Sequence, residues 1–229
     1  MGISLVTSSA AQNNGQASAT TVTCTLGATT TTGNLVVMFF NIASNRGITS
    51  VTDNIGGNTY QVDRPVILLN SVYNAAISSV LAAGGASFQI TVNLSGGTSS
   101  GADATCAEFS STTGWTAPAA QTVDTGEGTG VAASTLTTGL VTTQAEELIV
   151  SRHRTNAART VTNQSGFSDL IPTAATSSAF HSEYFVTSST NTYQAGFTWT
   201  TTTAFGIVGV AYKNTAAAGG DNRRAIVVS

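Results

Sequence analysis

The chain has 229 residues, of which 41% are hydrophobic and only 8% are charged, and Lys213 is its single lysine. A formal net charge of −3 and a pI near 5.2 exclude the broad electrostatic attraction to nucleic acid that a basic protein has. No stretch approaches the roughly 18 consecutive apolar residues of a membrane-spanning helix. We therefore expect neither nucleic acid nor a membrane among its partners.

The chain begins MGISLVTSSAAQ, which lacks the basic and apolar regions of a secretory signal peptide. The rest is dominated by Thr, Ser, Ala, Gly, Val and Asn, a composition typical of extracellular all-β proteins. Such a chain without an export signal predicts a virion component that is assembled in the host cytoplasm, released by lysis and exposed on the particle exterior. A weakly charged surface favours association, so we expect a homo-oligomer, for example a trimer.

Alternation of apolar and polar residues, the signal of half-buried strands, dominates the chain. It predicts strands at Thr21–Leu26, Asn34–Ala43, Ile48–Asp53, Thr59–Val62, Ser71–Ser79, Ser87–Leu94, Asp103–Ser110, Glu147–Arg154, Ala179–Thr187, Thr192–Thr200 and Phe205–Lys213. Turn clusters rich in Gly, Asn and Ser separate these runs, a spacing typical of sandwiches and barrels. Weak helical signals cover Ala75–Ala83 and Ala145–Leu148. The apolar-poor segment Pro118–Thr143 is expected to be a long connection across the sandwich.

The middle of the chain has no linker rich in proline or charge, which favours one domain over two. We expect an N-terminal segment at 1–19, a β-sandwich domain at 20–214 and a flexible C-terminal arm at 215–229. The arm joins the spacer TAAAGG to two arginines and a short apolar run. We expect this run to add a strand to a neighbouring subunit; the alternative is a tail without a partner.

The run ITSVTDNIGGNTYQVD, from Ile48 to Asp63, resembles a β-sandwich domain of bacteriophage virion proteins and bacterial surface proteins, in which a strand reading TSVTD precedes a G-N-T-Y hairpin. Other stretches fit the same pattern in order: GNLVVMFFNIA, SFQITVNLSG, TCAEFSSTTGW, EELIVSRH and GFTWTTTTAFGIVGVAYK. The resemblance covers residues 20–214. It implies a single antiparallel β-sandwich, jelly-roll-like, with a structural or binding role. It carries no catalytic residues.

Motifs of catalysis are weak. Gly97–Gly101 matches the G-x-S-x-G nucleophile pattern, but a strand follows it where that motif needs a helix. His153 and His181 are the only histidines, too few for a metal site without further ligands. Glu146 and Glu147 are adjacent, which on a strand places them on opposite faces rather than as a glycosidase pair. The sequence predicts neither an enzyme nor a cofactor.

Basic residues gather in two places, one strand end and the arm. Together with the apolar end of the arm they are the predicted inter-subunit contacts: Arg152, Arg154, Arg223, Arg224, Ile226, Val227 and Val228. Their partner is another copy of the chain or a virion protein such as a major capsid protein. The alternative for the strand end is that its arginines cover apolar surface with their stems.

Trp115, in STTGWTAP, falls in a turn-like loop where an exposed ring would stack on a sugar; the alternative is that it closes the rim of the core. Two readings of function follow. The chain is a capsid decoration or cement protein, or a head or tail spike subunit; alternatively it is a carbohydrate-binding or adhesive module.

Cys24 and Cys106 are the only cysteines, too few for a disulfide framework or a zinc site. Both fall in strand-like runs. Two buried free thiols and a single disulfide between them remain open from the sequence.

Overall fold

The computed structural model describes residues 2–9, 12–13, 19–70, 72–97, 102–170 and 178–215. Within these ranges the chain is all-β and forms four sheets whose strand pairs are all antiparallel. The prediction of an all-β antiparallel protein is confirmed, although four sheets exceed the two of one sandwich.

The central sheet has the strand order β1-β9-β4-β7-β6, and β2 also pairs with β9. Its strands are β1 (Ile3–Ser8), β2 (Gln12–Asn13), β4 (Leu35–Ile42), β6 (Gln61–Leu69), β7 (Val72–Val80) and β9 (Asp103–Ser111). All eight residues of β4, LVVMFFNI, are buried. A strand buried on both faces needs a layer on each side, which explains why this run is continuously apolar.

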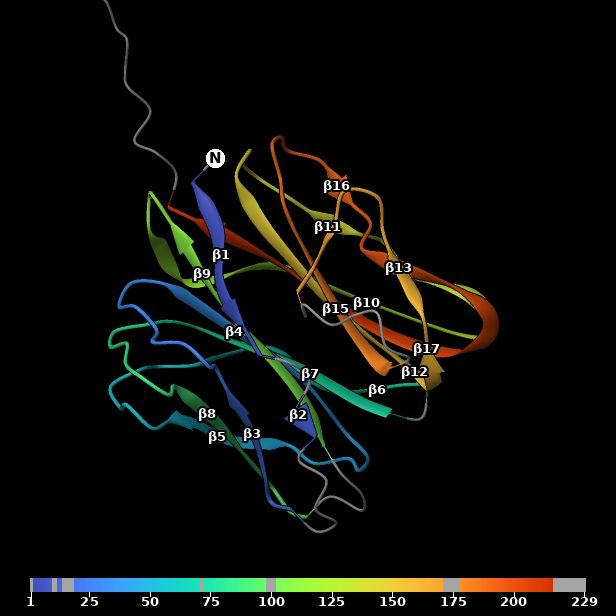
Figure 1. Ribbon diagram of the computed structural model, residues 1–229, viewed down its shortest axis with the longest axis horizontal. Helices are drawn as coiled ribbons and strands as arrows, with labels where there is room; N and C mark the ends of the chain where they lie inside the picture. The colour runs from blue at the N-terminus through green and yellow to red at the C-terminus, as the bar shows by residue number, and fades with distance from the viewer. Residues whose placement is uncertain are drawn as a thin grey trace, which may run out of the picture.

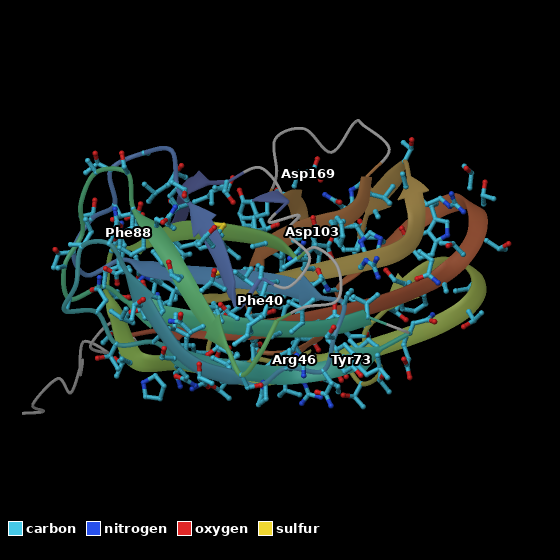
Figure 2. All side chains as sticks on the ribbon, turned by 90° about the horizontal axis from the view of Figure 1, so that it is seen from below. Phe40, Arg46, Tyr73, Phe88, Asp103 and Asp169 are labelled. Atoms are coloured by element: carbon cyan, nitrogen blue, oxygen red, sulfur yellow. A yellow bond between two sulfur atoms is a disulfide. The ribbon has the colours of Figure 1, made fainter. Side chains whose placement is uncertain are left out.

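One face of the central sheet is covered by a three-stranded sheet of order β3-β8-β5, grouped at the lower left of Figure 1. Its strands are β3 (Thr21–Thr25), β5 (Ile48–Asp53) and β8 (Gln89–Leu94). Alternate residues of β4, including Met38 and Phe40, pack with Ile90 and Val92 of β8 in this first core. Phe88, which precedes β8, belongs to the same core and is labelled with Phe40 in Figure 2.

The other face is covered by a sheet of order β10-β17-β12-β15-β14, with β13 also paired to β17. Its strands are β10 (Trp115–Thr135), β12 (Glu147–Arg159), β13 (Val161–Asn163), β14 (Ser168–Asp169), β15 (Ser178–Val186) and β17 (Gly196–Asn214). The remaining residues of β4, such as Val37 and Phe39, pack on Val150 of β12 and Val210 of β17 in a second core. The central sheet therefore lies between two other sheets.

The long strands β10 and β17 form a ribbon that curls at the right of Figure 1. One stretch of β10, from Trp115 to Gly128, pairs with β17 between Asn214 and Phe205; a second, from Val131 to Thr135, pairs with its beginning. Gly126 has no room for a Cβ, because the carbonyl oxygen of Thr135 lies against it. The ribbon thus folds back tightly on itself.

The curl encloses a third core, formed by Leu136, Leu140, Ile149, Ala195, Phe197, Trp199, Phe205, Ile207 and Ala211. The short strands β11 (Leu140–Val141) and β16 (Thr192–Tyr193) pair beside it. Most of the segment Pro118–Thr143, expected to be a long connection across the sandwich, is strand β10.

The N-terminal segment 1–19 contributes β1, which pairs with β9 at the edge of the central sheet. The helical signal at Ala75–Ala83 is overridden by pairing, because β7 runs through Val80 between β4 and β6. Burial of Ala75 and Ala76 between two sheets outweighs the low strand propensity of alanine.

Cys24 and Cys106 form a disulfide, with their Cα atoms 6.1 Å apart. Cys24 lies on β3 and Cys106 on β9, so the bond joins the three-stranded sheet to the central sheet. Both residues are fully buried in the first core. Of the two readings that the sequence left open, the structure therefore has the disulfide.

Candidate functional site

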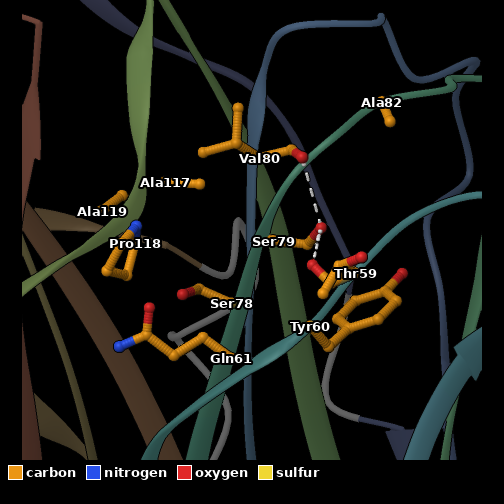
Figure 3. Close-up of a pocket in the computed structure, with 10 residues that line it drawn as sticks. All are labelled: Thr59, Tyr60, Gln61, Ser78, Ser79, Val80, Ala82, Ala117, Pro118 and Ala119. Atoms are coloured by element: carbon orange, nitrogen blue, oxygen red, sulfur yellow. Dashed lines mark hydrogen bonds between the residues drawn. The ribbon is translucent and has the colours of Figure 1, made fainter.

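A groove of about 390 Å³ lies where the central sheet meets the ribbon (Figure 3). We call it the β6/β10 groove. It is lined by Thr59, Tyr60, Gln61, Ser78, Ser79, Val80, Ala82, Ala117, Pro118 and Ala119. These residues come from the start of β6 and the two residues before it, from the end of β7 and the turn after it, and from the start of β10. The volume lies within the range of pockets that take small ligands or a few side chains of a peptide.

The position of this groove follows from strand order. β6 and β10 each end the order of their sheet, so each has one edge without a strand partner in that sheet. Pro65 and two register shifts interrupt β6, features that are confined to edge strands and bulges. Ser79 donates a hydrogen bond to the carbonyl oxygen of Thr59 at 2.8 Å, drawn in Figure 3, and holds the start of β6 on β7.

The lining carries no charged side chain, and alanine, valine, proline and the tyrosine ring make up much of it. One polar atom stands out. The Oε1 atom of Gln61 is buried and has no hydrogen-bond partner. Such an atom loses its hydration without compensation, so a ligand that brings an N–H or O–H donor would bind favourably here.

A buried carboxyl group lies behind the groove wall. Ser78 donates to Oδ1 of Asp63 at 2.9 Å, and Tyr212 donates to Oδ2, also at 2.9 Å. Burial raises the pKa of Asp63 to about 7, although these two hydrogen bonds act in the opposite direction. Ser78, which lines the groove, is therefore hydrogen-bonded to a group that titrates near neutral pH.

The rim beside Tyr60 is fixed by the turn after β5. Asp53 accepts hydrogen bonds from the Gly56 amide at 2.7 Å and from the Tyr60 hydroxyl at 2.9 Å. Burial opposes ionisation of Asp53, but its hydrogen bonds to Gly56, Asn58 and Tyr60 outweigh burial and lower its pKa. Asp53 therefore ends β5 in a turn.

The lining of the groove is suited to binding a ligand, because it is neutral and mostly apolar. Ser78 donates its hydroxyl hydrogen to Asp63, and both histidines lie elsewhere, against the third core. A neutral groove with a single unsatisfied acceptor favours an uncharged, mostly apolar ligand that carries a hydrogen-bond donor.

The histidines form a second cluster, enclosed by the curl of the ribbon. The ring of His153 is fully buried, with its centroid 4.3 Å from that of Phe197 and 5.6 Å from that of Trp199. The ring of His181 stacks on it at 5.2 Å. Burial and then the charges of His181 and Arg152 hold the pKa of His153 well below its usual value, so the ring is neutral.

Glu183 lies on β15 near these rings and is also buried. It accepts hydrogen bonds from the Gly196 amide at 2.9 Å and from Ser151 at 3.1 Å. Burial raises its pKa to about 8. Within the described ranges, no group of three or more His, Cys, Asp or Glu residues could hold a metal ion. These side chains are packed inside the curl, and His153, His181 and Glu183 are each at most 3% exposed.

The predicted contact residues of β12 are placed differently from expectation. Arg152 does share a side of the strand with Val150, but that side faces the central sheet, and Arg152 is only 3% exposed. It donates to the carbonyl oxygens of Phe39 at 2.7 Å and Asp103 at 3.1 Å. The prediction that Arg152 contacts a neighbouring subunit is wrong, because a second sheet covers it.

Arg154 lies two residues further along β12 and is partly exposed. Its guanidinium group sits 5.4 Å from the ring centroid of Phe180, which the guanidinium of Arg152 also approaches at 5.1 Å. The predicted contacts Arg223, Arg224, Ile226, Val227 and Val228 lie outside the described residues. An inter-subunit role for Arg154 and for those five remains a prediction.

The reading of Trp115 as a sugar platform is contradicted. Its side chain is 8% exposed, belongs to the second core, and donates from Nε1 to the carbonyl oxygen of Phe109 at 3.2 Å. A stacking platform needs an open ring face. Trp199 is equally buried, at 6% exposure.

The sequence patterns did not predict the residues that line the groove. Gln61 and Ser78 sit in ordinary alternating runs, and the lining comes from three segments that are far apart in the chain. One signal was present: Pro65 inside a strand-like run marks an edge strand, where a partner can bind.

No family model, no curated protein and no solved structure matches the chain. The described residues include no helix of the length and apolar character needed to cross a membrane.

Proposed function

We propose that the chain is a non-enzymatic structural component of a virus particle, a capsid decoration or cement protein or a subunit of a head or tail spike. It works through contacts with other copies of itself and with a major capsid protein. The observation that supports this proposal is the neutral, exposed edge formed by β10.

β10 is 21 residues long and lies at the edge of its sheet. Val123 and Val131 are 36% and 38% exposed on it, and Asp124 and Glu127 are its only charged residues. Edge strands that avoid association carry charges, particularly lysine, or are covered. The segment after β10 covers part of this edge, because the Thr137 amide donates to the carbonyl oxygen of Thr125 at 3.1 Å. The exposed valines and the lack of lysine suit the rest of β10 to repeated contact with another chain.

The surface is even less charged than the composition indicates, because four charged residues are buried: Glu108, Glu147, Arg152 and Glu183. Glu108 illustrates how they are used. Its Oε1 accepts hydrogen bonds from the Thr31 amide and the Asn34 side chain, both at 2.7 Å. Weak neutral contacts become strong when they are repeated over a symmetric shell.

The order of strands in the first half supports a jelly-roll-like arrangement. The pairs β1–β9, β3–β8 and β4–β7 are nested, as in a long hairpin. Apart from β2 and β6, which also belong to the central sheet, the strands from β1 to β9 alternate along the chain between the central and the three-stranded sheets. Rolling up a long hairpin of two chain segments in this way gives the double Greek key of that fold, which is common in capsid proteins.

The experiment is immunogold labelling with an antibody against the purified chain. Particles released by lysis of the producing culture are banded by density and labelled. We expect gold on the outside of intact particles and the chain at a fixed ratio to the major capsid protein. A chain found only in the particle-free fraction would overturn the proposal.

A further inference from the structure

We propose that the β6/β10 groove is the docking site of the chain's own segment Ala225–Val228, which reads AIVV. This inference goes beyond the proposed function, because it gives the arm a binding site on its own chain in the free subunit. The segment lies outside the described residues, whereas the groove and the point from which the segment departs are both described.

The chemistry of the groove matches this segment. The lining is uncharged and offers the ring of Tyr60 and the side chains of Val80 and Pro118 to small apolar groups. A peptide also brings backbone N–H donors, which the unpaired Oε1 of Gln61 requires. The preceding residues Asp221–Arg224 include three charges and are not suited to a lining without a counter-charge.

The described part of the chain ends at the rim of the groove. Thr215 is the last described residue; its amide donates to the carbonyl oxygen of Gly114 at 2.9 Å. The Thr215 hydroxyl lies 2.9 Å from the hydroxyl of Thr116, and the next residue along β10, Ala117, lines the groove. The chain therefore leaves the described structure next to the site.

The spacer between Thr215 and Ala225 is long enough for the segment to reach the groove. Residues 216–224 separate Thr215 from Ala225, and nine residues span at most about 30 Å when extended. The spacer contains Gly219 and Gly220, which allow a reversal of direction. A tether this short gives the segment an effective concentration in the millimolar range. Docking on the same chain is therefore favoured over docking from a second copy at ordinary protein concentrations.

Edge strands on both sides of the groove add a further reason. β6 and β10 each present backbone groups that their own sheets leave unpaired, and an extended segment can pair with such an edge. The side chains of an extended segment alternate, so that every second one would enter the groove while the backbone lies along an edge.

The test is site-directed cross-linking of the full chain. Ala82 is exposed and lines the groove, so the variant Ala82→Cys/Val227→Cys places one thiol at the groove and one on the segment. The matched control is Ala132→Cys/Val227→Cys, because Ala132 is exposed on β10 but is not part of the lining. A short bifunctional maleimide is added to dilute protein, and products are read by denaturing gel and peptide mass spectrometry.

We expect an intramolecular cross-link in the monomer band that is at least about tenfold more abundant than in the control, because docking holds residue 227 beside residue 82, whereas an undocked tether would reach both positions. Ala117→Glu, which adds a charge at an exposed lining position, should reduce it to the control level. A cross-linked dimer would overturn the proposal in favour of a second copy, and equal cross-linking in both variants would overturn docking altogether. This readout uses the free subunit, so it is independent of whether particles carry the chain.

Discussion

Tyr212 of β17 donates a hydrogen bond to Asp63 of β6 at 2.9 Å and so fastens the ribbon to the central sheet. The two residues are 149 positions apart in the chain. Ser78 holds the other carboxylate oxygen of Asp63 and lines the β6/β10 groove. One buried carboxyl group thus connects the two halves of the structure and the wall of the candidate site.

The raised pKa of Asp63 predicts that the protein loses stability as the pH rises. Its pKa is about 7 in the folded protein and near 3.8 in an unfolded chain, so between these values the folded state holds a proton that the unfolded state has released. The free energy of unfolding therefore falls through this window. Asp63→Asn should flatten the fall, by at most about 1.4 kcal/mol per pH unit. Urea unfolding of the wild type and of Asp63→Asn at pH 5, 6, 7 and 8 measures how the free energy of unfolding changes with pH in each protein.

A second variant tests the cause. The hydrogen bond from Tyr212 lowers the pKa of Asp63, so Tyr212→Phe should extend the falling region to higher pH. Glu183, whose pKa is raised to about 8, contributes a slope of the same sign that both variants retain. A pH profile of Asp63→Asn that is parallel to the wild type would contradict the raised pKa of Asp63.

The lowered pKa of His153 predicts that the protein also loses stability as the pH falls into the acid range. Its ring is buried and neutral in the folded state, whereas an unfolded histidine takes up a proton below about pH 6.5. The unfolded state then binds more protons, so stability falls as the pH drops through this value. His153→Phe keeps an aromatic ring against Phe197 and Trp199 and removes two unpaired buried nitrogens. It should be less sensitive to acid than the wild type.

Unfolding followed by tryptophan fluorescence at pH 5 and pH 7 checks this prediction. The difference between the two pH values, compared between His153→Phe and the wild type, isolates the histidine, because Asp63 and Glu183 titrate in both proteins. His181→Phe is the comparison variant, since the Nε2 of His181 already lies 3.1 Å from the carbonyl oxygen of Arg159. An unchanged difference in His153→Phe would show that another group carries the acid sensitivity.

Local patterns predicted the strands well where the pattern itself sets the structure. β5 has the predicted bounds, Ile48–Asp53, because alternation defines the strand and the Asp53 side chain ends it in a turn. β10 was missed, since a Gly- and Thr-rich run has little strand signal of its own. It is a strand because β17 pairs with it along most of its length, and such pairing overrides weak propensity.

Layers and the candidate site depend on contacts that no local pattern contains. Alternation along β12 places Arg152 on the same side as Val150, yet only the stacking of a second sheet shows that this side is buried. The same holds for Trp115, whose surroundings STTGW resemble an exposed turn. Pro65 marks one edge strand beside the groove, but the groove itself was not predictable, because its walls are brought together by the meeting of two sheet edges.

Trp115→Ala is expected to destabilise the protein rather than to abolish sugar binding. The indole is buried in the second core and its Nε1 is bonded to Phe109. Truncating a buried tryptophan costs about 3–5 kcal/mol in lost contacts and residual cavity. Urea unfolding measures the loss, and Thr116→Ala, at an exposed neighbour, is the control. If the two variants were equally stable, the buried placement of Trp115 would be wrong.

Reducing the disulfide between Cys24 and Cys106 should lower stability substantially. The two residues are 82 positions apart, and opening a loop of that length releases about 4.5 kcal/mol of unfolded-state entropy in the chain-entropy model. We compare wild-type protein with the bond intact and after reduction in denaturant, because the thiols then keep nearly the same packing in the first core. The reduced form should unfold at a lower urea concentration, and Cys24→Ala/Cys106→Ala should behave like it. The same unfolding midpoint with and without reductant would mean that the two sulfur atoms are not bonded in solution.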